Sequence, residues 1–354
     1  MIQSIHGGDI YQNKVKWDFS VNVNPLGVPK EIENALYKAV GRCQEYPDIQ
    51  ALALKEAVSK QLAVPKQYLL FGNGASEIFM GLVHAMKPKK ILIPVPSFWG
   101  YEYVAKAEGS EIQYFLLKKE NFFLPGEELF HILSEDIDLL FLANPNNPTG
   151  QLLEHQYLQN LLNLCRKQGI YVVLDECFIG FCKEEKSFIS KIEEYPNLIL
   201  IQAFTKIYSI PGVRLGFMIS SNEELVEKIA RHLPEWNLSV FAQEAGIACV
   251  KQKSYIEKTV EYVEKERIFL AERLQMMGIQ VCSGVGNFIL IYTEIPLYKL
   301  LLERGILIRD CQNFRGLSKG YYRIAVKCRE HNEILLREIG ECFAENRTVI
   351  AGRN

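Results

Sequence analysis

Short runs of apolar residues alternate with amphipathic segments through the middle of the chain. Six runs rich in Leu, Ile, Val and Phe predict strands: residues 68–74, 90–96, 136–145, 170–176, 197–204 and 214–220. Residues 75–86 and 154–169 lie between such runs and carry apolar side chains at helical spacing. Near-continuous apolar runs are typical of strands buried on both faces of a mostly parallel sheet. We therefore predict a large α/β domain over residues 45–235.

The last third of the chain has a different pattern. Residues 254–278 have the spacing of a long amphipathic helix with interleaved charges. Four short apolar segments and a closing helix from Asn332 follow it: residues 279–283, 287–293, 306–310 and 321–327. This order predicts a small α+β domain with antiparallel strands over residues 236–354. Residues 1–44 lack a strong period, and we expect them to pack with the small domain.

Composition excludes several classes of protein. Of 354 residues 48% are apolar and 23% charged, which is typical of a globular protein. The 40 basic and 42 acidic residues leave no basic excess for nucleic acid or an anionic membrane surface. Nine cysteines without C-x-x-C spacing indicate reduced thiols and a cytoplasmic location. We find no apolar segment of a signal peptide at the N-terminus and no run near the ~18 apolar residues of a membrane span.

One lysine stands out in the segment IQAFTKIYSIPGVRLGF, residues 201–217. Lys206 lies at the end of an apolar run that predicts a buried strand. A charged lysine inside a sheet would cost several kcal/mol unless it were paired or lost its charge. An exposed strand end or a neighbouring carboxylate would explain this lysine without any chemistry. The functional alternative is a desolvated amine that forms a Schiff base.

Polar groups follow two other predicted strands. The segment NPNNPTG, residues 144–150, follows one strand, and Asp175 ends another in VVLDE. Ligands of open α/β sheets bind outside the carboxyl ends of the strands. Turn chemistry would explain the first segment, and a helix N-cap or a salt bridge would explain Asp175. Alternatively, Asp175 is the counter-ion of a protonated ring nitrogen, as pyridoxal phosphate requires.

Glycines connect a strand to a helix in FGNGASE, residues 71–77. Backbone N–H groups and the helix N-terminus form an anion site at such a turn. The segment is neither G-x-G-x-x-G nor a Walker A motif, which argues against a dinucleotide or ATP. This turn supplies a phosphate cradle. Lys206 supplies an amine, Asp175 a partner for a ring nitrogen, and residues 144–150 a contact for a ring oxygen. One cofactor needs all four groups.

On these motifs the sequence resembles, over essentially its whole length, the fold-type I pyridoxal-phosphate enzymes of the class I/II aminotransferase superfamily. The resemblance implies an α/β PLP-transferase fold, with a large domain around a mostly parallel sheet and a small C-terminal α+β domain. It implies no metal. It assigns roles residue by residue: Lys206 forms the Schiff base, Asp175 pairs with the pyridine nitrogen, Asn147 bonds the ring 3-oxygen, Phe98 stacks on the ring, Arg214 with Gly74, Ala75 and Ser76 holds the cofactor phosphate, Arg323 binds the substrate carboxylate, and Tyr46 reaches the partner subunit's site in a homodimer.

Two branches of this superfamily share these motifs. They are the histidinol-phosphate aminotransferases and the L-threonine O-3-phosphate decarboxylases. Residues 6–8 (HGG), 18–27, 234–245 and 306–326 look more like the decarboxylases, and so does Phe178, where aminotransferases generally carry tyrosine. Phenylalanine cannot donate the hydrogen bond to the cofactor ring that a tyrosine would.

The decarboxylase branch predicts a reaction. We expect L-threonine O-3-phosphate to be converted to (R)-1-amino-2-propanol O-2-phosphate in cobalamin biosynthesis, with O-phosphoserine as a variant substrate. Histidinol-phosphate aminotransferase, with 2-oxoglutarate as acceptor, is the alternative. A non-catalytic regulator on this fold would carry a DNA-binding helix-turn-helix, for which the region before the sheet domain is too short and not basic enough.

A phosphorylated substrate needs a second anion site. Arg309 and Arg323 would lie on neighbouring strands if these form a hairpin, and two guanidinium groups can hold a carboxylate and a phosphate. A surface strand position is the alternative for Arg309. His6 and Asn24 are further candidates for phosphate contacts, Asn147 adjoins the substrate, and a solvated position is the alternative for His6.

Two positions depart from the family pattern. Ala203 stands where the family usually has Ser or Thr, so one hydroxyl to the cofactor phosphate is missing, and the neighbouring Thr205 is the candidate to replace it. Cys177 stands where Ala is common, which we interpret as a neutral packing change. Arg315 and Lys319 are expected to face water.

Overall fold

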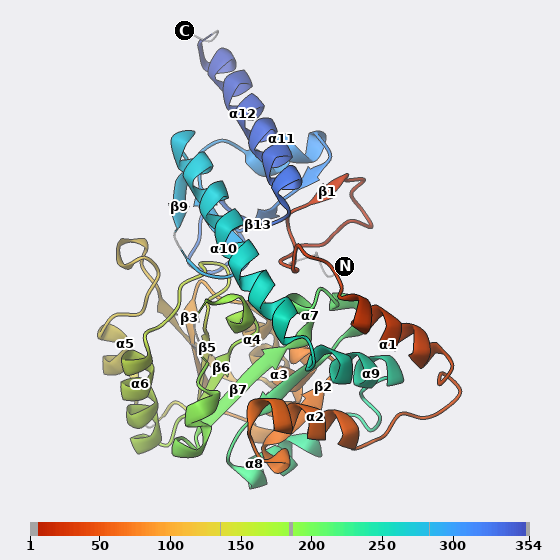
Figure 1. Ribbon diagram of the computed structural model, residues 1–354. Helices are drawn as coiled ribbons and strands as arrows, with labels where there is room; N and C mark the ends of the chain where they lie inside the picture. Colours follow the sequence, from red (N-terminus) through yellow and green to blue (C-terminus); the bar gives the residue numbers. More distant parts are fainter. Residues whose placement is uncertain (1–5, 135, 184–186, 283, 352–354) are drawn as a thin grey trace.

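The computed structural model describes residues 6–134, 136–183, 187–282 and 284–351 (Figure 1). A seven-stranded sheet forms its larger part, in the order β2-β8-β7-β6-β5-β3-β4. The strands are β2 (Leu69–Gly72), β3 (Lys90–Val95), β4 (Glu111–Leu116), β5 (Leu139–Ala143), β6 (Tyr171–Asp175), β7 (Leu198–Ala203) and β8 (Gly216–Ile219). Six of the seven confirm runs predicted from the apolar pattern. The pattern does not predict β4, a partly exposed edge strand that lacks a continuous apolar run.

The directions of the strands determine which strand ends lie at the same edge of this sheet. The pairs β3–β4, β3–β5, β5–β6 and β6–β7 are parallel. The strand β8 is antiparallel to both of its neighbours, β7 and β2, so β2 runs in the same direction as β7. The six co-directional strands therefore end at the same edge at which β8 begins.

Helices cover both faces of the sheet (Figure 1). One face carries α3 (Ala75–Met86), α4 (Trp99–Glu108) and α8 (Glu223–Ala230), whose apolar side chains join one core cluster with the sheet. The other face carries α1 (Lys30–Val40), α2 (Leu52–Leu62), α5 (Glu128–Ile132), α6 (His155–Lys167) and α9 (Val240–Cys249). Successive residues of a strand point to opposite faces, so Val172 and Leu174 lie in one core cluster and Val173 lies in the other. We call this part the sheet unit.

The rest of the chain forms a smaller C-terminal unit. It contains α10 (Lys253–Met276), β9 (Gln280–Cys282), β10 (Phe288–Tyr292), α11 (Leu297–Glu303), β11 (Ile306–Leu307), β12 (Arg309–Asp310), β13 (Tyr321–Ala325) and α12 (Arg329–Ala351). Its antiparallel sheet has the order β12-β13-β10-β9, as predicted for this region. Figure 1 shows α10 and α12 side by side in this unit.

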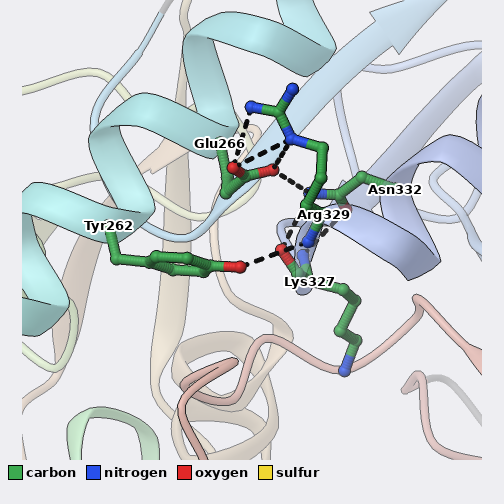
Figure 2. Close-up of polar contacts among 5 residues, drawn as sticks. All are labelled: Tyr262, Glu266, Lys327, Arg329 and Asn332. Atoms are coloured by element: carbon green, nitrogen blue, oxygen red, sulfur yellow. Dashed lines mark hydrogen bonds and ion pairs between the residues drawn. The ribbon is translucent and has the colours of Figure 1, made fainter.

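A buried glutamate of α10 is hydrogen-bonded to side chains at the start of α12 (Figure 2). Glu266 is 2% exposed and accepts hydrogen bonds from Arg329 Nε (3.0 Å) and Asn332 Nδ2 (3.0 Å). Asn332 also exchanges two hydrogen bonds with the Lys327 backbone, and the Tyr262 hydroxyl accepts one from the Arg329 N–H. The network fixes the chain directly after β13, the strand that carries Arg323. The helix begins at Arg329, three residues before the predicted start.

The N-terminal segment contacts both units. Its short strand β1 (Trp17–Asp18) pairs in parallel with β11 of the C-terminal unit. In contrast, α1 packs against α9, and Ile32 belongs to a core cluster of the sheet unit. The division at residues 44 and 235 stays a prediction. None of the described helices combines the length and apolar character that a bilayer crossing requires.

Candidate active site

A cavity of about 250 Å³ lies where the six co-directional strands end, next to the C-terminal unit. Most of the predicted site residues line it: His6, Ala75, Ser76, Phe98, Asn147, Asp175, Phe178, Thr205, Lys206, Arg214, Arg309 and Arg323. The topology explains this gathering, because the loops after β2, β5, β6 and β7 open on the same edge. Gly74, Asn24 and Tyr46 are the predicted residues that do not line the cavity.

Lys206 lies on α7 (Phe204–Ile207), one helical turn that follows β7 directly. The prediction placed it at the end of the strand itself, but the strand ends at Ala203. Burial, followed by the positive charge of Arg323, lowers the pKa of the Lys206 ammonium to about 8. A substantial fraction of this amine is therefore neutral, and hence nucleophilic, near physiological pH.

Asn24 supports the turn that carries Lys206. Its backbone N–H donates to Lys206 O (3.0 Å), and its Nδ2 donates to Ile207 O (2.7 Å) and Thr259 Oγ1 (2.8 Å). Its Oδ1 accepts from the Leu26 N–H. The side chain is thus fully engaged by the protein. Asn24 does not line the cavity and supports this turn, and its expected contact with substrate stays a prediction.

Asp175 ends β6 with a buried carboxylate. Its Oδ2 accepts from the Tyr101 hydroxyl (2.5 Å) and its Oδ1 from the Cys177 N–H (2.9 Å). Burial raises the pKa of this carboxyl group, and these hydrogen bonds act against the rise. The sequence does not reveal the part of Tyr101, because a tyrosine at an apolar position of a helix has the pattern of an ordinary core residue.

The N-terminus of α3 and Arg214 together form an anion cradle. Gly74 is the N-cap of α3 with φ +80°, and a Cβ there would lie 2.4 Å from Arg214 Nη2. Only glycine allows the guanidinium to pack so closely against the helix N-terminus. The first-turn N–H groups of Ala75 and Ser76 have no acceptor within the helix, and the helix dipole favours an anion there. Arg214 precedes the antiparallel β8, and this direction brings it to the same edge.

Two buried arginines face each other on the C-terminal unit. Arg309 on β12 pairs with Arg323 on β13, as the hairpin hypothesis requires. Arg323 donates to Asn147 Oδ1 (2.5 Å) and to Ser20 O (2.9 Å), and Arg309 donates to Asp310 O (2.6 Å) and Asn313 Oδ1 (2.8 Å). Burial lowers the pKa of Arg323 to about 10. Both side chains are less than 10% exposed, so the surface alternative for Arg309 is wrong.

Aromatic rings and His6 complete the cavity wall. The His6 ring lies 5.8 Å from the Phe98 ring between their centroids, and Phe178 packs edge-on against Phe288 at 5.1 Å. Burial, and then the charges of Arg309 and Arg323, lower the pKa of His6. His6 therefore borders the cavity beside these cations, and it is also exposed to solvent.

An ion pair at the cavity also escaped the sequence analysis. Arg315 is 48% exposed in its side chain, as expected, but it also lines the cavity and donates to both carboxylate oxygens of Glu102. Glu102 is buried on α4 and also binds Lys106. Because Glu102 neutralises Arg315, the cationic character of the cavity comes mainly from Arg309, Arg323 and the groups around Lys206.

Tyr46 lies outside this cavity. Its side chain is 81% exposed and its ring lies 5.1 Å from that of Trp236. An exposed tyrosine can reach a neighbouring molecule, so its expected place in the partner subunit's site stays a prediction.

The donor set fits pyridoxal phosphate. The cavity offers a buried amine of lowered pKa, a buried carboxylate, an arginine on a helix N-terminus and an aromatic ring. The glycine at position 74 leaves space that a side chain would fill at the phosphate cradle. These are the groups that bind the aldehyde, the ring nitrogen, the phosphate and the ring face of this cofactor.

Sequence comparisons agree with this fit. The family model described as "Aminotransferase class I and II" matches residues 14–339. The threonine-phosphate decarboxylase of Salmonella typhimurium is 32% identical over 348 residues, which cover 95% of this chain and 96% of the relative. The adenosylcobalamin biosynthesis bifunctional protein CobDQ of Leptospira interrogans is 31% identical over 98% of this chain and 42% of its own length.

A solved structure extends the likeness to the aminotransferase branch. The histidinol-phosphate aminotransferase from Clostridium acetobutylicum superimposes with a TM-score of 0.87 at 33% identity. The match covers 93% of this chain and 99% of that one.

Proposed function

Since the chain belongs to the aminotransferase class I and II family, a family of pyridoxal-phosphate enzymes, we propose that it decarboxylates L-threonine O-3-phosphate. The product would be (R)-1-amino-2-propanol O-2-phosphate, made in cobalamin biosynthesis, with O-phosphoserine as a variant substrate. A threonine-phosphate decarboxylase matched over 96% of its length supports this choice, and so does a bifunctional cobalamin protein matched over 42% of its length. We also propose a cytoplasmic enzyme, supported by nine cysteines that are all free thiols.

The pairing of Arg309 with Arg323 carries the proposal. Two buried guanidinium groups on neighbouring strands suit a substrate that bears two anionic groups. Arg323 would bind the carboxylate and Arg309 the phosphate, with His6 beside them. Histidinol phosphate has a phosphate but no carboxylate. If it bound here, one of the two guanidinium groups would have no anionic partner on this substrate.

Each cofactor contact has a proposed residue. Lys206 would hold the aldehyde, Asp175 the ring nitrogen, and Asn147 the ring oxygen. The phosphate would bind to Arg214, Thr205 and the N–H groups after Gly74, and the rings of Phe98 and Phe178 would pack at the cofactor ring. When bound, pyridoxal phosphate supplies a sink for the electron pair that remains when a bond to the substrate α-carbon breaks.

Orientation decides which bond breaks. The bond that stands perpendicular to the cofactor ring is the one that can break. Arg323 on the carboxylate and Arg309 on the phosphate would together orient the substrate so that the bond to the carboxylate takes that direction. The bond between the α-carbon and the carboxylate would then break, carbon dioxide would leave, and a proton would have to be added to the same carbon. Lys206 would deliver that proton, and its pKa of about 8 supports this role, because the ammonium form gives up a proton readily at that value.

Asp175 would keep the ring nitrogen protonated. A carboxylate in a buried place interacts strongly with an adjacent cation, because little water screens the pair. Its position at the end of β6 is fixed by the sheet and by two hydrogen bonds. The negative charge of Asp175 would thus stabilise the protonated ring on which the electron sink depends.

A homodimer is part of the proposal. Tyr46 would reach the site of the other subunit, and its exposure supports this. Further exposed apolar side chains lie close by in the sequence: Tyr37, Val40, Ile49 and Leu52. Apolar side chains that gather on a surface are typical of an interface with another protein.

Histidinol-phosphate transamination is the second candidate. It is favoured by one observation, the TM-score of 0.87 with the Clostridium acetobutylicum structure. The groups around the cofactor serve both reactions, so the fold alone does not separate them.

Product analysis tests the choice. The purified enzyme with pyridoxal phosphate is incubated with L-threonine O-3-phosphate in the absence of 2-oxoglutarate. We expect carbon dioxide and the amine phosphate in equal amounts, with O-phosphoserine as a parallel substrate. Glutamate formed from 2-oxoglutarate and histidinol phosphate, without carbon dioxide from either phosphoamino acid, would overturn the proposal.

A further inference from the structure

Tyr101 on α4 lies next to Asp175, and no motif of the sequence draws attention to this tyrosine. The Tyr101 hydroxyl donates to Asp175 Oδ2 at 2.5 Å, while the Cys177 N–H binds the other oxygen. Tyr101 is fully buried, and Asp175 is 8% exposed at the cavity. An O–H group that donates to a carboxylate over this distance is among the strong charge-assisted hydrogen bonds.

The tyrosine ring is held from three sides. It stacks on Phe141 with centroids 4.8 Å apart and planes 7° from parallel. Phe79 and Phe98 meet it edge-on, at 5.3 and 5.6 Å. A ring packed in this way has little rotational freedom, so its hydroxyl stays at one position relative to β6. Phe98 also lines the cavity, so the same aromatic cluster reaches the place where the cofactor ring would bind.

The hydroxyl can only donate here. Burial, and then the Asp175 charge, raise the pKa of Tyr101 well above its usual value, so the phenol keeps its proton. Burial also favours the neutral form of Asp175, whereas a donated hydrogen bond favours the ionised form. Tyr101 and the Cys177 N–H therefore oppose the effect of burial on the same carboxylate.

We propose that Tyr101 is a positioning residue for Asp175: its hydroxyl holds the carboxylate ionised and turned toward the ring nitrogen of the cofactor. Tyr101 itself does not line the cavity and acts through Asp175. The inference rests on the proposed role of Asp175 and adds the residue that maintains it.

The test follows cofactor binding by the apoenzyme as a function of pH. Tyr101→Phe removes only the hydroxyl and keeps the packed ring. Binding of pyridoxal phosphate is measured by equilibrium dialysis from acid to neutral pH. In Tyr101→Phe we expect the acid-side midpoint of binding to move up by about one pH unit, because the carboxylate has lost a donor and takes up a proton more readily.

A matched control lies on the same helix. Tyr103 is 53% exposed, and Tyr103→Phe is expected to bind the cofactor with the wild-type midpoint. A purely structural role of Tyr101 would lower the melting temperature without moving the midpoint. A folded Tyr101→Phe protein with the wild-type midpoint would therefore overturn the proposal.

A second variant keeps the test decisive if Tyr101→Phe does not fold. Site-specific 3-fluorotyrosine at position 101 retains the ring and makes the hydroxyl a stronger donor. The midpoint is then expected to move down, opposite to the phenylalanine variant, and an unchanged midpoint would contradict the proposal.

Asp175→Asn separates this inference from the function on which it rests. We expect weak cofactor binding at every pH in that variant. If Asp175→Asn binds as the wild type does, the proposed role of Asp175 fails. If Asp175→Asn weakens binding but Tyr101→Phe and the fluorinated protein leave the midpoint unchanged, only the role of Tyr101 fails.

Discussion

Arg309 and Arg323 lie directly opposite each other on β12 and β13, and both side chains are buried at the cavity. Like charges at opposite positions of a strand pair are destabilising unless an anion lies between them. The arrangement is therefore best explained by a ligand with more than one anionic group, and the two arginines should contribute differently to its binding.

We expect Arg309 to bind the substrate phosphate and Arg323 to bind its carboxylate. Arg309→Gln should weaken binding of L-threonine O-3-phosphate at least about thirtyfold, from the ~2 kcal/mol or more that a broken buried charge pair costs, and leave L-threonine nearly unchanged. Arg323→Gln should weaken both. Inhibition constants of the two amino acids measure this. Arg337, exposed on α12, provides the control variant Arg337→Gln. Equal losses for both ligands in Arg309→Gln would mean that Arg309 does not bind the phosphate.

The second prediction concerns the phosphate cradle. Gly74 (φ +80°, ψ 163°) and Gly109 (φ +80°, ψ 19°) both have positive φ, but Gly109 lies in the left-handed helical region, which alanine enters at a lower cost. At Gly74 the added Cβ would lie 2.4 Å from Arg214 Nη2, whereas at Gly109 no atom lies within 4 Å. Gly74→Ala should therefore weaken pyridoxal phosphate binding by about tenfold or more, while Gly109→Ala keeps the wild-type affinity and shows only the loss of stability that its positive φ causes. If a fluorescence titration gave the same affinity for pyridoxal phosphate in Gly74→Ala and Gly109→Ala, the assignment of the phosphate cradle would be contradicted.

The pH dependence of cofactor attachment follows from Lys206. Only the neutral amine attacks the aldehyde, and burial lowers the pKa of Lys206 to about 8. The rate constant of covalent attachment to the apoenzyme should therefore rise with pH through a midpoint near 8. Stopped-flow absorbance measures this rate. A midpoint near 10.5, the ordinary value for lysine, would show that the amine is not desolvated.

A buried glutamate next to Asp175 should affect stability. Glu176 accepts from Ser187, Gln202 and the Phe188 N–H, and burial raises its pKa to about 7 from 4.5. Between these values the unfolded chain loses the proton first, so it binds fewer protons and stability falls as pH rises. The loss reaches at most about 3 kcal/mol from pH 4.5 to above 7.

Glu176→Gln should remove this loss. Its melting temperature should exceed that of the wild type at pH 8 and come close to it at pH 5. The exposed Glu257 gives the control Glu257→Gln, for which no such pH-dependent difference is expected. A constant difference between wild type and Glu176→Gln across this range would contradict the assignment.

Much of this site follows from strand endings alone. Asp175 ends an apolar run, and Lys206 follows one closely, because parallel strands deliver such residues to a common edge. Arg214 is different: it reaches that edge because β8 runs antiparallel, and the apolar pattern of a strand carries no information on its direction. Family resemblance, and not periodicity, located it.

Tertiary contacts explain the residues that the sequence did not reveal. Tyr101 and Glu102 occupy ordinary helical positions in α4, and their importance arises only where α4 meets Asp175 and Arg315. His6 and Asn24 show the same limit, because both are polar residues of the N-terminal segment. Packing places His6 in the cavity and commits Asn24 to the turn of Lys206. The local sequence does not distinguish these two outcomes.

The attachment point of the cofactor is the central claim, since every other role is assigned relative to it. Reduction of the holoenzyme with borohydride, followed by peptide mass mapping, tests it most directly. The account predicts one stable adduct, on the peptide that contains Lys206, and none in Lys206→Ala. An adduct on a different lysine, or no adduct in the wild type, would contradict it.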